Sequence, residues 1–320
     1  MKERIVVITG PTGVGKTHLS LRLAQIFNAE IVSADSMQIY RYMNIGAAKP
    51  TPEEQALVPH HLIDIRNPDE DYSAAEFKKD ADESIREVIG KGRSVFVVGG
   101  AMLYLRVLTK GLFEAPPIDY ALRERFKALC KEKGNAWLYQ RLKDIDSEAA
   151  RRIHPKDTFR IIRALEVFEL TGKPISWHQE QHKFKASFYD YLKICLNMPR
   201  SLLYERINHR VEKMFSQGLI DEVEELLKMG YKPNLKSMKS IGYRHVVGYL
   251  QGKFGLEDTK EKIKQATRHY AKRQLTWFRY EPEINWYNLS EEKKIIEDIK
   301  HFYLKSSKGV RSEREKREKT

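Results

Sequence analysis

Short, mostly apolar runs alternate with helix-period patterns over the first part of this chain. The runs are Ile5–Ile8, Ala29–Val32 and Ser94–Val98, and each has the length of a buried strand. Before the third run, a capping box at Ser73–Glu76 opens a segment whose apolar residues recur at helical spacing. This strand–helix–strand order predicts a parallel sheet covered by helices, which is an α/β fold.

After Ala115–Pro117 the pattern changes to helices alone, and a β-compatible segment returns only at Tyr191–Leu196. The helices between are therefore expected to be inserted into the α/β core. The predicted helices beyond Pro117 are Tyr120–Lys133, Ala136–Lys143, Thr158–Leu170, Leu202–Phe215, Ile220–Met229, Tyr243–Leu250 and Glu257–Tyr280. The predicted parts are a first stretch of core (1–115), a helical insertion (116–190), a completion of the core with basic helices (191–304) and a charged, disordered tail (305–320).

A complete phosphate-binding loop directly follows the first predicted strand. Its residues are Gly10, Pro11, Thr12, Gly13, Val14, Gly15, Lys16 and Thr17. In such a loop, glycines let backbone N–H groups converge on phosphate oxygens, the lysine supplies a positive charge and the threonine can hold Mg²⁺. The loop predicts a P-loop NTPase-like sheet that handles a diphosphate or a triphosphate.

Only one of the next two predicted strands ends in a carboxylate. The strand at Ala29–Val32 runs into Asp35, whereas the strand at Ser94–Val98 runs into Gly99 and Gly100. In an open α/β sheet the ligand binds beyond the carboxyl ends of the strands, so both turns are expected to face the phosphate loop. Asp35 could support a metal ion, act as a general base or cap a helix.

The charge of the chain indicates a partner larger than a nucleotide. The net charge is +13 and the sequence pI is about 9.4, and the segment Lys305–Thr320 contributes +4 of that charge, with seven Lys or Arg against three Glu. The remaining +9 suits a polyanion. In the last predicted helix, Arg268, Lys272 and Arg279 fall close to one face beside Arg273, and this stripe is either a phosphate-backbone contact or a solvated surface.

The cysteines and histidines give no sign of a metal centre. Cys130 and Cys195 are too far apart for a metal-ligand motif and form no disulfide framework, which favours a reducing cytoplasm. The pair His60 and His61 has no further ligands at a convincing spacing and is interpreted as structural. The start of the chain is too short for a signal peptide, and no apolar run approaches the length of a membrane span.

Taken in order, several motifs resemble the tRNA dimethylallyltransferases, also called tRNA isopentenyltransferases. The resemblance reaches from the phosphate loop to about Leu289. It is carried by Gly10–Thr17, Ala34–Tyr40, Gly46–Pro50, Pro59–Asp64, Tyr72–Ala74, Val98–Gly100, Arg160, Arg163–Val167, Met214–Phe215, Gly218–Leu219, Ile241–Arg244, Thr267–Arg268, Ala271–Gln274 and Thr276–Trp277.

This resemblance implies transfer of a dimethylallyl group from dimethylallyl diphosphate to N6 of the adenosine next to the tRNA anticodon. Asp35 would accept the proton, Lys16 and Mg²⁺ on Thr17 would stabilise the leaving diphosphate, and Arg244 would join the loop in binding it. The enzyme would be a monomer with tRNA as partner and no membrane. The residues implied to contact tRNA are Asp35, Ser36, Met37, Gln38, Ala101, Arg123, Phe159, Arg160, Ile161, Ile162, Arg163, Lys239, Ser240, Ile241, Gly242, Tyr243, Arg244, Arg268, Lys272 and Arg273.

The chain departs from the family pattern at a few positions. Ala101 stands where the family usually has Thr, so a hydroxyl expected near the target adenosine is missing. Lys156 replaces an Asn, and Val14 stands where a small residue is common. The loss of the hydroxyl at Ala101 would slow catalysis or shift the contact to Ser36 or a water, whereas neither Lys156 nor Val14 removes a charge that the mechanism needs.

Other functions compete with this interpretation. A small-molecule kinase would use the loop for ATP and the insertion as a lid, but it leaves the basic helix unexplained. A nucleic-acid-binding protein with a vestigial loop would not need the intact Lys16 and Thr17. A related enzyme that prenylates a free adenine nucleotide would not need the basic surface.

Overall fold

The chain forms two compact units. In the computed structural model residues 2–113, 116–182 and 188–317 are described, with side chains described up to Leu304. The first unit comprises Met1–Thr109 and Phe188–Thr320, and the second comprises Lys110–Ser187. The second unit begins at Lys110 and ends at Ser187, so both of its ends lie a few residues before those of the expected insertion at 116–190.

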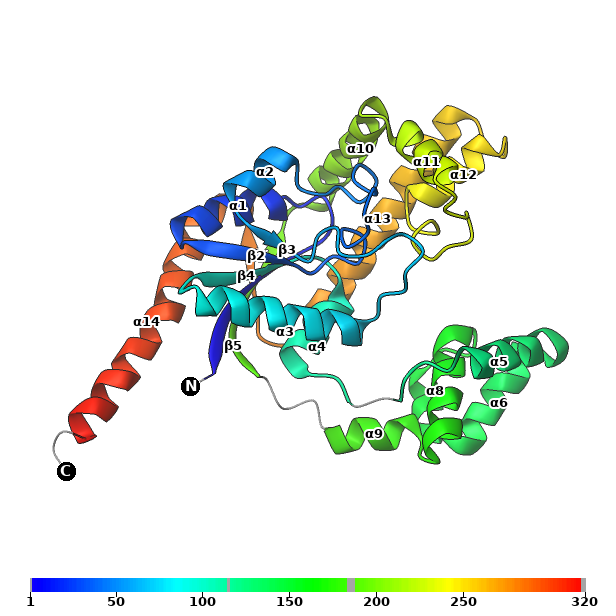
Figure 1. Ribbon diagram of the computed structural model, residues 1–320, viewed down its shortest axis with the longest axis horizontal. Helices are drawn as coiled ribbons and strands as arrows, with labels where there is room; N and C mark the ends of the chain where they lie inside the picture. The colour runs from blue at the N-terminus through cyan, green and yellow to red at the C-terminus, as the bar shows by residue number, and fades with distance from the viewer. Residues whose placement is uncertain (1, 114–115, 183–187, 318–320) are drawn as a thin grey trace. The chain divides into compact units, whose positions relative to one another are not determined.

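A six-stranded parallel sheet forms the centre of the first unit (Figure 1), which confirms the predicted α/β fold. The strands lie in the order β3 (His60–His61), β2 (Ala29–Ser33), β4 (Ser94–Val98), β1 (Glu3–Thr9), β5 (Tyr189–Asn197) and β6 (Ile284–Asn288). In register, Ile5 of β1 lies opposite Val95 on one side and Tyr191 on the other. The strands β1 and β4 are apolar throughout their centres because helices cover both faces of the sheet.

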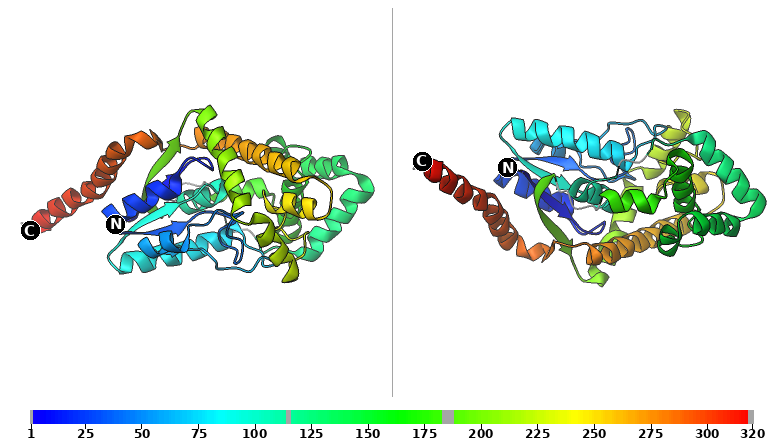
Figure 2. Two further views of the ribbon diagram at one scale, coloured as in Figure 1. Left: turned by 90° about the horizontal axis from the view of Figure 1, so that it is seen from above. Right: turned by 90° about the horizontal axis from the view of Figure 1, so that it is seen from below.

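Helices pack on both faces of the sheet. Helices α1 (Lys16–Ile26) and α14 (Glu292–Arg317) share one core cluster with the strands, through residues such as Leu23 and Ile299. On the other side lie α3 (Ala74–Gly90) and α4 (Met102–Lys110), which are joined by stacked rings of Phe77 and Tyr104, 4.2 Å apart (Figures 1 and 2). The strand β5 is fixed to this layer where the chain returns from the second unit, because the hydroxyl of Tyr189 donates to Asp82 at 2.7 Å.

The remaining helices of the first unit lie beyond the carboxyl ends of the strands and beside the sheet. They are α2 (Pro52–Leu57), α10 (Arg200–Ser216), α11 (Leu219–Lys228), α12 (Tyr243–Leu250) and α13 (Leu256–Tyr280), and a 3₁₀ turn, η1, spans Leu289–Glu291. Of these, α10 packs along α13, and α12 packs against both α11 and α13. The helices predicted from the sequence are all present, and their ends differ from the prediction by at most two residues.

The sequence analysis missed the edge strand β6, the short strand β3 and the helices α2, α4, α7 (Ser147–Arg152), α9 (Ile175–His182) and α14. In β6 only Tyr287 is buried, because an edge strand has one neighbour and little apolar surface to cover. Helix α14 begins at Glu292 and continues past Leu304, but the side chains of 305–320 lie outside the described part of the chain. The disorder predicted for the tail therefore stays a prediction.

The second unit is a bundle of short helices with a core of its own. Its helices are α5 (Tyr120–Lys133), α6 (Asn135–Ile145), α7 (Ser147–Arg152), α8 (Thr158–Thr171) and α9. Phe126, Leu138 and Leu142 pack against Ile161 and Leu165 of α8, and all five side chains are buried. The caps come from Asp119, Asp146 and Asp157, whose side chains accept backbone N–H groups in the first turns of α5, α7 and α8.

In the described residues, the histidine pair and the cysteines have structural surroundings. His61 bonds the carboxylate of Glu30 at 2.6 Å and His60 bonds the carbonyl of Val58 at 2.7 Å. Cys130 and Cys195 are free thiols. No helix among the described residues has the length and apolar character that a membrane span requires.

We predict that Gly99→Ala destabilises the first unit severely. A Cβ at Gly99 would lie 2.0 Å from the carbonyl oxygen of Ala34, and both atoms belong to the packed carboxyl edge of the sheet. The expected loss of unfolding free energy is about 3 kcal/mol or more. Urea unfolding followed by circular dichroism measures it.

Gly90→Ala is the matched control. A Cβ there meets nothing within 4 Å at the end of α3, so this change should leave stability unchanged or raise it by about 0.5 kcal/mol. Equal stability of the Gly99→Ala and Gly90→Ala proteins would contradict the close approach at Gly99.

Candidate active site

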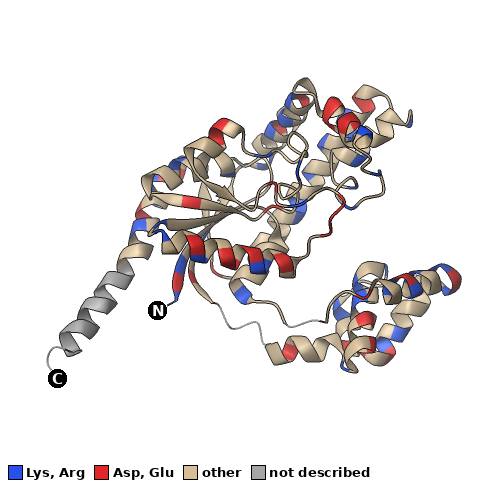
Figure 3. Ribbon diagram, in the orientation of Figure 1, with Lys and Arg blue, Asp and Glu red and all other residues tan. Residues whose placement is uncertain are grey.

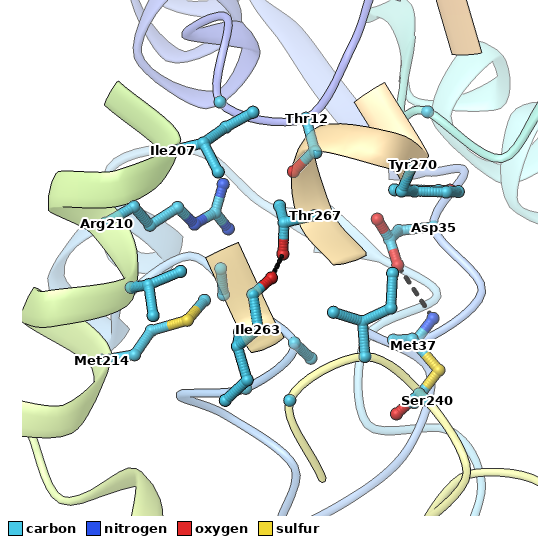
Figure 4. A pocket seen from close by; sticks show the side chains of 18 of the residues that line it. Thr12, Asp35, Met37, Ile207, Arg210, Met214, Ser240, Ile263, Thr267 and Tyr270 are labelled. Atoms are coloured by element: carbon cyan, nitrogen blue, oxygen red, sulfur yellow. Dashed lines mark hydrogen bonds between the residues drawn. The ribbon is translucent and has the colours of Figure 1, made fainter. Parts of the chain in front are cut away.

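A cavity of about 990 Å³ opens beyond the carboxyl ends of the strands, and all the residues that line it belong to the first unit. Its walls come from segments that are distant in the sequence: the phosphate loop, the turn after β2, the segment Gly46–Ala48, the helices α10 and α13, and the segment before α12. Figure 4 shows Arg210 reaching from α10 on one side of the cavity and Asp35 on the other. The topology therefore brings the two predicted chemical groups, the loop and the carboxylate, to one site.

The phosphate loop has the backbone that its glycines predict. Gly10, Gly13 and Gly15 have positive φ angles of 140°, 84° and 106°, and Gly15 is the residue before α1. A side chain at Gly10 would meet the carbonyl oxygen of Leu196 at 2.6 Å, so only glycine fits. The loop therefore presents backbone N–H groups and the positive end of a helix to the cavity.

Lys16 is held inside the loop that it serves. Its Nζ donates to the carbonyl oxygens of Gly10 and Pro11 at 2.9 and 3.0 Å. Burial lowers the pKa of Lys16 to about 8, and the nearby Asp35 carboxylate limits that shift while Arg210 adds to it. The ammonium group is therefore poorly solvated, and an anion in the cavity would stabilise its charge.

Gln274 of α13 joins the phosphate loop to the glycine turn after β4. Its Oε1 accepts the N–H of Thr12 at 2.8 Å, and its Nε2 donates to the carbonyl oxygen of Gly100 at 2.9 Å. The side chain is buried, and a Cβ at Gly100 would lie 2.4 Å from its Nε2. The long basic helix thus fixes the backbone that surrounds the anion site.

Asp35 caps a turn rather than a helix. Its Oδ1 accepts the N–H of Met37 at 2.8 Å, and the residues that follow form turns. This bond orients the carboxylate toward the cavity, beside the ring of Tyr270 (Figure 4). Burial and the Asp35 charge raise the pKa of Tyr270, so its phenol stays protonated.

Helix α10 contributes a basic face that the sequence analysis missed. Four side chains of this helix line the cavity: Arg206, His209, Arg210 and Lys213. They lie three, four and seven residues after the first, a spacing that places them on one side of a helix. This spacing could have revealed the basic face from the sequence. Burial lowers the pKa of Arg210, and the charge of Asp35 opposes that shift. Among the described residues Arg210 has no recorded hydrogen-bond or ion-pair partner, so its guanidinium is available to an anion.

The predicted site residues of the first unit are only partly in the cavity. Those that line it are Thr12, Gly13, Gly15, Lys16, Thr17, Asp35, Ser36, Met37, Gln38, Lys239, Ser240, Ile241, Gly242, Arg244 and Arg273. The side chains of Val14 and Tyr243 are instead buried in the packing of the unit. Ala101 stands at the start of α4, where its N–H donates to Ala34.

The basic stripe of α13 is partly neutralised by neighbours. Arg268 donates to Asn208 of α10 at 2.7 Å and lies 3.9 Å from the carboxylate of Glu261. Lys272 and Arg273 are exposed. The helix therefore keeps exposed cations in its C-terminal half, while Arg268 also serves to attach α13 to α10.

The predicted contact residues of the second unit divide into interior and surface. The buried carboxylate of Glu166 accepts two bonds from Arg123 at 2.9 Å, one from Arg163 at 2.5 Å and one from the N–H of Asp119. Burial opposes ionisation of Glu166, but these hydrogen bonds outweigh it and keep its pKa below the ordinary value. Both arginines are thus committed to an internal network.

Four further residues of α8 were expected at the RNA surface. Ile161 and Ile162 are buried in the core, so their side chains are packing residues and not surface residues. Phe159 is 73% exposed, and Arg160 is exposed. The ring of Phe159 also lies 5.8 Å from the guanidinium carbon of Arg123, so this exposed ring packs on a cation of the internal network, and Arg160 is the exposed cation beside it.

Sequence relatives resemble the chain along nearly its whole length. The tRNA dimethylallyltransferase 2 of Geotalea uraniireducens is 50% identical over 290 residues, which are 91% of this chain and 94% of that protein. The tRNA dimethylallyltransferase of Geobacter sulfurreducens is 47% identical over 285 residues, 89% of this chain and 92% of that protein.

Solved structures and a family model agree with these relatives. The full-length tRNA isopentenylpyrophosphate transferase from Bacillus halodurans matches with a TM-score of 0.71 and 39% identity, covering 97% of this chain and all of that one. A eukaryotic dimethylallyltransferase acting on tRNA matches with a TM-score of 0.78 and 28% identity, covering 89% of this chain and 74% of that one. The model of the family described as IPP transferase matches residues 38–281. With most of its length inside that match, the chain belongs to the IPP transferase family.

Proposed function

We propose that this protein is a tRNA dimethylallyltransferase. It transfers the dimethylallyl group of dimethylallyl diphosphate to N6 of the adenosine next to the tRNA anticodon, and it releases diphosphate. The observation that carries the proposal is that Lys16 of the phosphate loop and Asp35 line one cavity at the carboxyl edge of the sheet, in a chain whose relatives are named tRNA dimethylallyltransferases.

The cavity has room and charge for both substrates. A volume of about 990 Å³ is at the upper end of the range for small-molecule sites, which suits a diphosphate and a nucleoside bound together. Lys16, Arg210 and the first-turn N–H groups of α1 surround the place for the diphosphate. As the allylic C–O bond breaks, negative charge grows on the leaving oxygen, and these fixed donors stabilise it.

Asp35 accepts the proton that the reaction releases from the amine. A C–N bond forms between the dimethylallyl carbon and the exocyclic amine of adenine while the C–O bond breaks, and the amine loses a proton. The carboxylate of Asp35, oriented by the N–H of Met37, accepts that proton. Binding energy from the rest of the tRNA aligns the amine with the allylic carbon.

The residues present fit a Mg²⁺ ion that shares its ligands with the substrate. Thr17 lines the cavity at the first turn of α1, and among the described residues no group of three or more His, Cys, Asp or Glu could hold a metal by itself. Thr17 and the diphosphate oxygens would hold the ion, as is usual for Mg²⁺. When bound, the ion neutralises charge on the diphosphate.

The tRNA partner follows from the exposed cations around the cavity. Figure 3 shows Lys and Arg positions distributed along α10 and α13, and Lys239, Arg244 and Arg273 line the cavity itself. Chemistry on a base requires the nucleotide to leave its stack, which is easiest in a single-stranded loop such as that of the anticodon. We expect the enzyme to act as a monomer in the cytoplasm.

The direct test is incubation of unmodified tRNA with the protein, Mg²⁺ and dimethylallyl diphosphate, followed by nucleoside mass spectrometry. We expect N6-dimethylallyladenosine in this reaction and no phosphorylated product in a parallel reaction with ATP. Absence of the modified nucleoside, together with consumption of ATP, would instead support a kinase.

We predict that Asp35→Asn lowers the rate of transfer by about 10²–10⁴-fold while tRNA affinity is retained. The amide keeps an oxygen that can accept the N–H of Met37, so the turn should persist and only the base is lost. Single-turnover kinetics and filter binding measure the two quantities. Asp35→Ala, which loses both the base and the cap, is the comparison, and transfer at the wild-type rate in Asp35→Asn would reduce Asp35 to a capping residue.

We predict that affinity for dimethylallyl diphosphate falls above about pH 8. The pKa of Lys16 in the free protein is lowered to about 8, and the anion binds the protonated form, so affinity is constant below that pH and falls above it by up to about tenfold per unit. Calorimetry of the wild type and of Lys16→Ala separates this titration from that of the ligand. The ratio of their affinities should shrink from pH 8 to pH 9.5, and a constant ratio would contradict the assignment.

We predict that Lys272→Ala and Arg273→Ala each weaken tRNA binding and flatten its salt dependence. Both side chains are exposed on α13, and each lost phosphate contact should reduce the slope of log K against log salt by about 0.7–0.9. Lys300→Ala on α14 is the control, because this exposed lysine lies away from the cavity lining. Slopes that match the control would make the stripe a solvated surface.

A further inference from the structure

The carboxylate of Glu222 in α11 bonds two segments that are far apart in the sequence. Its Oε2 accepts the N–H groups of Asn44 and Ile45 at 2.8 and 2.7 Å. Its Oε1 accepts the N–H of Gly46 at 3.1 Å and the hydroxyl of Tyr243 at 2.7 Å. Bonds to an ionised acceptor are stronger than bonds between neutral groups, so this one side chain ties the segments firmly.

Both segments continue directly into walls of the cavity. Gly46–Ala48 lines it from one segment, and Lys239–Gly242, which ends just before Tyr243, lines it from the other. The two walls also touch, because a Cβ at Gly46 would lie 2.4 Å from the ring of Tyr243. Glu222 itself is not among the residues that line the cavity, so any effect it has on a ligand passes through these walls.

The hydroxyl of Tyr243 is suited to donate a hydrogen bond to Glu222. The side chain is fully buried in the first turn of α12. Burial and the Glu222 charge raise the pKa of Tyr243 well above its ordinary value, so the phenol remains a donor. Lys49 directly follows the Asn44–Ala48 segment and fixes its far end. The Nζ of Lys49 donates to the side-chain oxygen of Asn44 and to the carbonyl oxygen of Tyr40.

Gln38 extends the connection to the turn that carries Asp35. Its Nε2 donates to the carbonyl oxygen of Ala48 at 3.2 Å, and its Oε1 accepts the hydroxyl of Ser33 at 2.9 Å. Ser33 and Gln38 bracket Asp35 in the sequence. The hydrogen bonds of Gln38 therefore join the Gly46–Ala48 wall to the turn that carries Asp35.

We propose that Glu222 is a positioning residue for the transfer reaction: by joining the Gly46–Ala48 and Lys239–Gly242 walls, it fixes the target nucleotide relative to Asp35. The inference rests on the proposed function, because the adenosine of tRNA is the ligand that these walls would hold. The diphosphate end is secured separately, by Gln274 from α13. Loss of Glu222 should therefore affect tRNA far more than dimethylallyl diphosphate, for which Arg244, the residue after Tyr243, is the expected ligand nearest to Glu222.

The test compares Glu222→Ala and Glu222→Gln with Glu225→Gln, a control on the same helix whose side chain is exposed and paired with Lys228. In Glu222→Ala we expect kcat/KM for tRNA to fall by about ten- to a hundredfold, with a raised KM. Glu222→Gln should be intermediate, because its amide oxygen can serve Asn44 and Ile45 while its NH₂ group faces the N–H of Gly46. Glu225→Gln should match the wild type.

Calorimetric titration with dimethylallyl diphosphate supplies the second readout. Its stoichiometry counts folded sites, so partial unfolding cannot imitate a change in KM for tRNA, and its dissociation constant should change far less than KM for tRNA in the Glu222 variants. A wild-type KM for tRNA in Glu222→Ala, or a loss of diphosphate affinity as large as the loss for tRNA, overturns the inference.

If Glu222→Ala does not fold, the Tyr243→Phe variant tests the inference instead. It removes one of the four donors to Glu222 and keeps the ring, so KM for tRNA should rise a few-fold, and an unchanged KM overturns the inference. Failure of the wild type to prenylate tRNA overturns the proposed function and this inference with it, whereas an active wild type with unaffected variants overturns the inference alone.

Discussion

The active-site region depends on the close approach of three backbone turns at the carboxyl edge of the sheet. A Cβ at Gly99 would lie 2.0 Å from the carbonyl oxygen of Ala34, and a Cβ at Gly100 would lie 3.5 Å from that of Gly10, which itself packs against the backbone of Leu196 in β5. Only residues without a side chain allow this packing. Because the turns after β1, β2 and β4 are so close, the phosphate loop and Asp35 open into the same cavity.

Poorly solvated charge is the second organising feature of the site. Lys16 and Arg210 both have pKa values lowered by burial, and Asp35 is the carboxylate whose charge opposes each shift. Cations held this way lack the water that would compensate for a lost anion, so they favour an anion in the cavity. In the proposed reaction, the same arrangement would let a loop that often serves phosphoryl transfer stabilise a departing diphosphate.

Polar side chains from the helical end of the first unit hold this site in shape. Gln274 joins the phosphate loop to the turn at Gly100, and Glu222 joins the Asn44–Gly46 segment to Tyr243. Each satisfies backbone groups that have no partner within a helix or strand, which is why a polar residue is retained there. In the second unit Glu166 has a comparable internal role, because it collects Arg123 and Arg163 into one network.

The sequence by itself determined the elements and the chemistry that are local. The phosphate loop, the strands at Ile5–Ile8 and Ser94–Val98, and the long helices follow from short-range spacing, and the motif order identified the family. Tertiary structure alone decided which charges are available. Arg123 and Arg163 are committed to Glu166, whereas Arg210 faces the cavity. The reason is that an ionic partner is chosen by distance in space, and spacing along the chain carries no record of a neighbour contributed by another helix.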